Sequence, residues 1–189
     1  MIECCDAHDW NDLQPLFDNH SSEFFHAVDA LAVHEPLRSA ESLPAGALAT
    51  GKRIWSSESW QSYANSDGGG CWARAVSWGY VKGNLTRHMA WNAIQSYPSV
   101  GNGLVYNGHG LMWAEVPWAG HYFVNSPIWV QAHYTQATAP GWSFLHVGSG
   151  SGMLPAGGSY VSLVSPGGCG KCDSSIRRTH LTVVVESRG

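Results

Sequence analysis

Glu58 is the side chain of this sequence whose position best suits catalysis. It stands near the end of a short apolar run, residues 54–60 (IWSSESW), and a polar, glycine-rich stretch follows. A buried strand would carry this carboxylate to the edge of a sheet, and barrel enzymes keep their catalytic groups at the C-terminal ends of their strands. The alternative is a surface glutamate at a strand end, which is the commoner situation for this spacing alone.

Two further residues occupy similar positions. His34 closes the apolar run 27–34 (AVDALAVH), and Trp91 lies inside the apolar run 87–94 (RHMAWNAI). A lone histidine at a strand end is as often a structural hydrogen-bonding group as a substrate contact. A tryptophan inside an apolar run is ordinarily a core residue.

The ten histidines and five cysteines do not form a metal-binding pattern. No histidine pair has the HExxH or i, i+4 spacing. Cys169 and Cys172 have CxxC spacing, but no second CxxC or histidine pair follows at zinc-finger distance. We therefore expect no metal and no organic cofactor.

Composition allows a folded domain rich in aromatic residues. The 189 residues are 13% charged and 12% aromatic, with ten tryptophans, and the net charge is −4. The chain lacks the basic footprint of a nucleic-acid-binding protein. No apolar run is long enough to span a bilayer. The N-terminus has no signal-peptide pattern and begins like a core strand, from which we expect a fragment of a longer protein.

Strands and helices alternate in the part of the chain that must position these residues. Apolar runs at 1–6, 27–34, 52–58 and 87–94 predict buried parallel strands. A flexible turn is predicted at residues 68–70, followed by an amphipathic helix over 72–80 that ends at Gly83.

The second part of the chain has a different character. A helix is predicted over 126–137, with Pro127 in its first turn. Short β runs follow at 142–147, 159–164 and 181–186. This change predicts two units, 1–140 and 141–189, with the boundary near Pro140.

Short blocks in a fixed order resemble the galactosylceramidase family of glycoside hydrolases. They include residues 33–36 (VHEP), 55–58 (WSSE), 70–72 (GCW), 89–92 (MAWN), 117–122 (PWAGHY), 126–130 (SPIWV) and 157–161 (GGSYV). The blocks span nearly all of this chain but only a middle portion of the family's length. The resemblance implies an α/β fold, the C-terminal half of a (β/α)8 TIM barrel followed by part of a β-sandwich.

The resemblance also implies the chemistry. Glu58 would be the nucleophile of a retaining hydrolase that cleaves the β-galactosyl bond of galactosylceramide-like glycosphingolipids, and His34, Trp91 and Tyr106 would line the sugar pocket. A saposin-like lipid-presenting protein and a lysosomal or secreted location are implied for the full-length parent.

The family's acid/base is a glutamate that follows an asparagine, and this sequence has no Asn-Glu pair. Asp6 and Glu35 are the nearest substitutes, and we expect the chain alone to be inactive. Glu35 and Ser59 stand where the family usually has Tyr and Asp. Because of these departures, the resemblance does not decide the substrate specificity. The alternative is a non-catalytic carbohydrate-binding protein or an inactive remnant.

Overall fold

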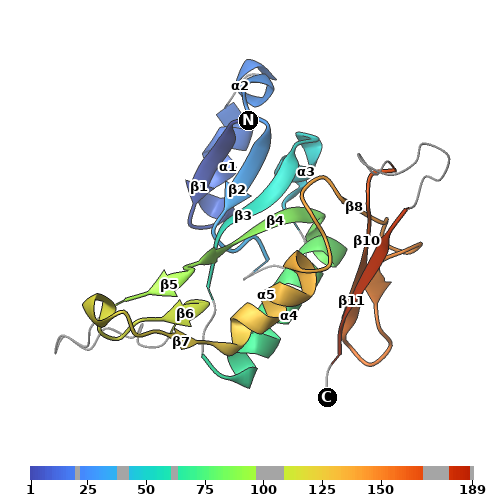
Figure 1. Ribbon diagram of the computed structural model, residues 1–189. Helices are drawn as coiled ribbons and strands as arrows, with labels where there is room; N and C mark the ends of the chain where they lie inside the picture. Colours follow the sequence, from blue (N-terminus) through green and yellow to red (C-terminus); the bar gives the residue numbers. More distant parts are fainter. Residues whose placement is uncertain (20–21, 38–42, 61–63, 97–108, 168–178, 188–189) are drawn as a thin grey trace.

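A four-stranded parallel sheet carries the candidate residues. The computed structural model describes residues 1–19, 22–37, 43–60, 64–96, 109–167 and 179–187. The strands are β1 (Glu3–Ala7), β2 (Ala30–Val33), β3 (Arg53–Trp60) and β4 (Leu85–Trp91), and they pair in chain order (Figure 1). All four residues of β2 are buried, as an inner parallel strand requires. The four predicted strands are confirmed.

Helices cover one face of this sheet. They are α1 (Trp10–Asn19), α2 (Ser22–Ala27), α3 (Ala45–Ala49) and α4 (Ser66–Gly83). The main apolar core lies between sheet and helices and contains Trp10, Leu13, Leu31, Val33, Ala47, Ile54 and Leu85. A smaller cluster of Ala30, Ala32 and Trp55 lies on the other face. The alternation of residues 30–33 between these two clusters gives the sheet two distinct faces.

Helix α4 begins earlier than its sequence predicts. Asn65 caps it by accepting a hydrogen bond from the backbone nitrogen of Gly68 at 3.2 Å, and residues 68–70 are helical. The predicted flexible turn at these glycines is therefore wrong. A Cβ at Gly69 would approach the Ser126 side chain to 3.3 Å, so the lack of a side chain there lets another helix pack closely.

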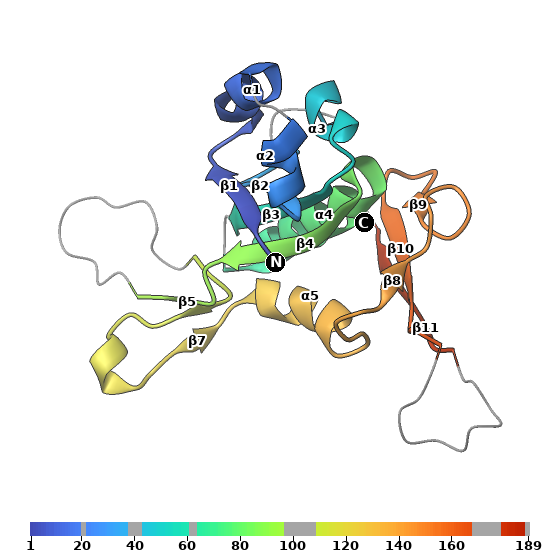
Figure 2. The ribbon, with the colours of Figure 1, turned by 90° about the horizontal axis from the view of Figure 1, so that it is seen from above.

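The chain leaves the main sheet at Trp91, and the predicted strand over 87–94 ends there. A second sheet follows, made of β5 (Ile94–Gln95), β6 (Met112–Trp113) and β7 (Phe123–Val124), with a 3-10 helix at Pro117–Ala119. These elements extend away from the body as an arm (Figure 2). Two-residue strands have no periodicity from which a sequence could predict them.

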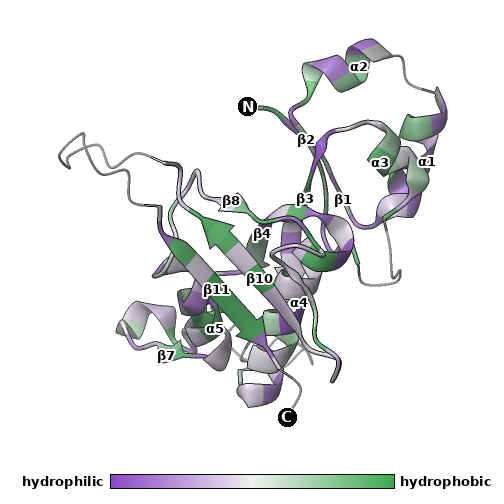
Figure 3. Ribbon diagram, turned by 90° about the vertical axis from the view of Figure 1, so that its right-hand side faces the viewer, coloured by the Kyte–Doolittle hydropathy of each residue, from purple (hydrophilic) through white to green (hydrophobic). Residues whose placement is uncertain are grey.

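The C-terminal region packs on α4. Helix α5 (Ser126–Thr135) confirms the predicted helix and lies along α4. Strands β8 (Ser143–Phe144), β9 (Gly152–Met153), β10 (Ser159–Val164) and β11 (Leu181–Glu186) form an antiparallel sheet. The exposed side of β11 is apolar (Figure 3). The boundary between residues 140 and 141 stays a prediction.

Contacts of α4 join the two regions. The Tyr80 ring stacks on Phe144 with 4.2 Å between centroids, and the Ser77 and Tyr134 hydroxyls are 2.6 Å apart. Arg74 forms an ion pair with the buried Glu186 of β11 at 3.0 Å. Because α4 contacts β4, α5, β10 and β11, it links the parallel sheet to the C-terminal antiparallel sheet.

Candidate functional site

Three polar side chains from neighbouring strands meet at the C-terminal edge of the parallel sheet. The His34 Nε2 atom lies 3.7 Å from Glu58 Oε2 and 3.4 Å from Asp6 Oδ1. Asp6 belongs to β1, His34 follows β2, and Glu58 belongs to β3. The structure therefore brings together two carboxylates and an imidazole that are distant in sequence. Asp6 and His34 are 28 residues apart, and His34 and Glu58 are 24 residues apart.

The backbone of His34 is held from both sides. Its N–H donates to the carbonyl of Ala7 on β1 at 2.9 Å. Its carbonyl accepts a hydrogen bond from the Ser56 hydroxyl of β3 at 2.7 Å. These bonds fix the strand end from which the imidazole projects, which limits how far its ring nitrogen can move from the carboxylates.

An irregularity in β3 sets the direction of Glu58. The pairing of β3 with β4 shifts register between Ser56 and Ser59, and the hydroxyls of these two serines hydrogen-bond to each other. Residues three apart do not share a face of a regular strand, so the shift re-aims the side chains between them. Glu58 is 26% exposed and lies toward His34, which leaves its carboxylate accessible to a substrate.

Below this edge, Trp55 lies on the face of the sheet opposite helices α1–α4. Its indole Nε1 donates to the Thr86 hydroxyl at 3.1 Å, and the Arg87 guanidinium lies 4.8 Å from the ring centroid. Arg87 also reaches Glu3 at 3.6 Å. Sequence reasoning missed Arg87, although a charged residue inside a strand expected to be buried is a recognisable sign of pairing.

The other predicted residues have different outcomes. Trp91 ends β4, is paired in register with Trp60, and is half-buried, so it lies at the same sheet edge as Glu58. Tyr106 falls outside the described residues. Glu35 lines a cavity beside α4 together with Ser59. The roles given to Glu58, His34, Trp91 and Tyr106 stay predictions.

Within the described part of the chain, no group of three or more His, Cys, Asp or Glu side chains has a metal-binding arrangement. No helix there combines the length and the apolar character needed to cross a membrane. Cys169 and Cys172 lie outside the described residues.

The chain is similar to known glycoside hydrolases. Residues 2–136 match the model of glycosyl hydrolase family 59. Galactocerebrosidase from Danio rerio is 40% identical over 161 residues, which cover 85% of this chain and 21% of that protein. Galactocerebrosidase from Homo sapiens is 40% identical over 167 residues, covering 88% and 21%. The chain thus spans about a fifth of the length of these relatives.

A solved structure shares the fold. The catalytic domain of GH30 xylanase C from Talaromyces cellulolyticus superposes with a TM-score of 0.52 at 17% identity, covering 86% of this chain and 38% of that chain. This likeness concerns the fold alone. Together with the parallel β1–β4 sheet it confirms the expected α/β fold, the C-terminal half of a barrel followed by part of a β-sandwich. The family resemblance is confirmed as well: the chain belongs to glycosyl hydrolase family 59.

Proposed function

We propose that this chain is part of a retaining glycoside hydrolase that cleaves the β-galactosyl bond of galactosylceramide-like glycosphingolipids, with Glu58 as the nucleophile. One observation carries the proposal: the half-buried Glu58 carboxylate lies at the C-terminal edge of a parallel sheet, 3.7 Å from the His34 imidazole. Catalytic groups of barrel enzymes occupy this edge.

In the proposed reaction, a Glu58 oxygen attacks the anomeric carbon as the bond to the leaving oxygen breaks. An acid protonates that oxygen, and water then hydrolyses the glycosyl-enzyme ester with the same group acting as base. The second carboxyl group must stand about 5–5.5 Å from the nucleophile. Asp6 is the described carboxylate that shares an imidazole with Glu58, whereas the family's acid/base follows an asparagine and has no counterpart in this sequence.

The substrate part of the proposal rests on the relatives named galactocerebrosidase. His34, Trp91 and Tyr106 would contact the sugar. A saposin-like lipid-presenting protein and a lysosomal location belong to the same proposal for the full-length parent.

A non-catalytic carbohydrate-binding protein is the second candidate. The arm carries exposed aromatic rings at Trp118 (79% exposed) and Tyr122 (59% exposed). Sugars bind to such rings through their apolar faces without any need for a nucleophile.

A chimera distinguishes the two. The matching segment of the Danio rerio relative is replaced by this chain, and the protein is treated with a 2-fluoro-β-galactosyl fluoride. The fluorine slows hydrolysis of the glycosyl-enzyme, so the adduct should accumulate. We expect the added mass on the tryptic peptide 54–74, which contains Glu58.

Two variants serve as controls. Glu58→Gln should abolish labelling, while Glu115→Gln, an exposed residue of the arm, should leave it unchanged. A label on Asp6, Glu35 or Glu115 would contradict the assignment of the nucleophile. Saturable sugar binding by a folded chimera that never becomes labelled would favour the binding protein.

A further inference from the structure

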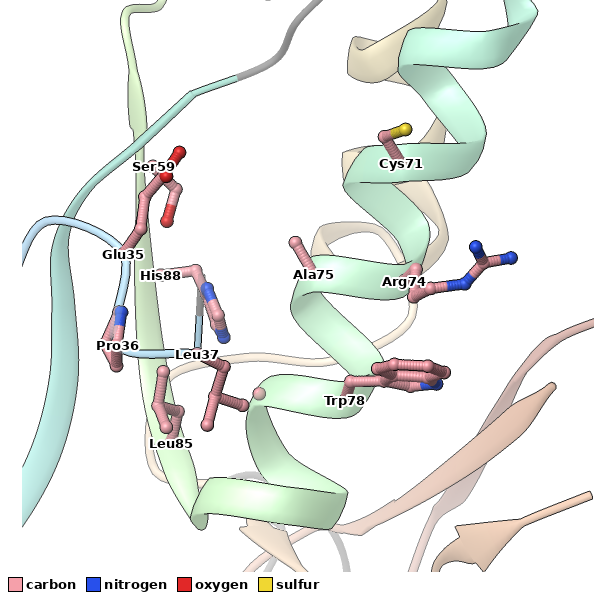
Figure 4. A pocket seen from close by; sticks show the side chains of 11 residues that line it. Glu35, Pro36, Leu37, Ser59, Cys71, Arg74, Ala75, Trp78, Leu85 and His88 are labelled. Atoms are coloured by element: carbon pink, nitrogen blue, oxygen red, sulfur yellow. The ribbon is translucent and has the colours of Figure 1, made fainter. Parts of the chain in front are cut away.

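We infer that the cavity between α4 and β4 is a binding site for a small, neutral ring compound that carries one hydrogen-bonding nitrogen. The cavity has a volume of about 420 Å³. Its walls are mostly apolar, with Leu37, Ala75, Trp78 and Leu85 among them, and His88 lies on the β4 side (Figure 4). An apolar hollow of this size with few polar groups is typical of small-molecule sites.

Nitrogen atoms of two residues in the cavity wall, His88 and Trp78, have no hydrogen-bond partner among the described residues. Three side-chain nitrogens of these two residues make no hydrogen bond within the part of the chain that the structure describes: Nδ1 and Nε2 of His88, and Nε1 of Trp78. All three are shielded from water. A buried polar atom without a partner costs about 1–3 kcal/mol. A ligand with a complementary nitrogen would satisfy one or two of these atoms.

The charge state of His88 indicates that the ligand is neutral. Burial lowers the pKa of its imidazole to about 4, so the ring is neutral near pH 7, with one nitrogen donating and the other accepting. Trp78 adds a donor. Arg74, at the cavity wall, is held by Glu186 at 3.0 Å and is not available to attract an anion. These groups suit a neutral heteroaromatic ring.

This site is separate from the Glu58 edge. His88 packs edge-on against Trp72 of α4, with ring centroids 6.2 Å apart, and so faces the helix layer. Glu58 and His34 do not line the cavity, although their chain neighbours Ser59 and Glu35 do. Figure 4 shows those two residues together at one end of the cavity. The inference therefore does not depend on the proposed function.

Three flat rings of similar size test the inference. Indole donates one hydrogen bond, quinoline accepts one, and naphthalene does neither. Binding to the full chain is measured by isothermal titration calorimetry at pH 7. We expect saturable binding of indole and quinoline, at least about tenfold tighter than that of naphthalene, since tenfold corresponds to one hydrogen bond of about 1.4 kcal/mol.

Matched variants test whether the ligand binds in this cavity. Ala75→Leu fills the cavity and should abolish binding, whereas Ala73→Leu puts the same side chain on another side of α4 and should not. His88→Leu should remove the preference over naphthalene. Absence of saturable binding, equal binding of all three rings, or loss of binding in Ala73→Leu but not in Ala75→Leu would each overturn the inference.

Discussion

Arg87 of β4 forms an ion pair with Glu3 of β1 at 3.6 Å, although these strands are the two edges of the parallel sheet. The guanidinium passes over the Trp55 ring, 4.8 Å from its centroid. On β2, one of the two strands between them, Ala30 and Ala32 are small and leave that path clear. The face of the sheet opposite helices α1–α4 is thus spanned by the Arg87–Glu3 ion pair.

Replacing Arg87 by Met should reduce the free energy of unfolding by about 1 kcal/mol. Both partners are partly exposed, which keeps the ion pair near 0.2–1 kcal/mol, and the lost cation–π contact adds roughly 0.5–1 kcal/mol. Urea denaturation followed by tryptophan fluorescence measures the change. In a double-mutant cycle with Glu3→Gln, a coupling energy of zero would contradict the pairing.

The Arg74–Glu186 pair should matter more, because Glu186 is only 7% exposed. Arg74→Gln leaves its carboxylate buried without a cation and should cost about 3 kcal/mol. Lys82→Gln on the same helix removes a cation that lies 4.1 Å from the Trp78 ring and should cost about 1 kcal/mol at most. Equal losses in the two variants, measured by urea denaturation, would argue against a buried ion pair.

Stability should fall on acidification because of His88. Its folded-state pKa is about 4, below the ordinary value of 6.5, so the unfolded chain binds the proton first. The free energy of unfolding should therefore decrease as the pH falls from about 6.5 to about 4, by about 3 kcal/mol in total. Urea titrations at several pH values measure this slope. His88→Gln should remove most of this slope and leave the part due to His109, whose pKa burial also lowers, whereas His26→Gln, at an exposed residue, should leave the slope unchanged.

In the chimera before any labelling, the contact of His34 with Glu58 should affect the rate of hydrolysis. His34→Phe removes the ring nitrogen beside Glu58, the proposed nucleophile, and we expect kcat to fall by about tenfold to a hundredfold. Asp6→Asn should have a smaller effect, because Asp6 is 70% exposed and touches the same Nε2 from the solvent side. Turnover of an aryl β-galactoside measures both. An unchanged kcat in His34→Phe would show that the imidazole does not act on Glu58.

Local sequence patterns were sufficient for the elements with strong periodicity. The apolar runs ending near His34 and Glu58 predicted two adjacent parallel strands, because a strand buried on both faces has few polar residues. The pattern could not predict the helical conformation of residues 68–70. Three glycines favour a turn locally, whereas in the structure Asn65 caps the helix at Gly68 and α5 packs closely against Gly69.

The sequence by itself determined the family, the presence of four parallel strands and the presence of a carboxylate at the end of β3. Only the tertiary structure decided which groups surround that carboxylate. Asp6, His34 and Glu58 meet because parallel strands align their C-terminal ends, and the register shift after Ser56 turns Glu58 toward the imidazole. The same holds for Arg87 and Glu3, whose contact crosses two intervening strands. Contacts between residues far apart in the chain depend on sheet order and register, and neither quantity is encoded in a local pattern.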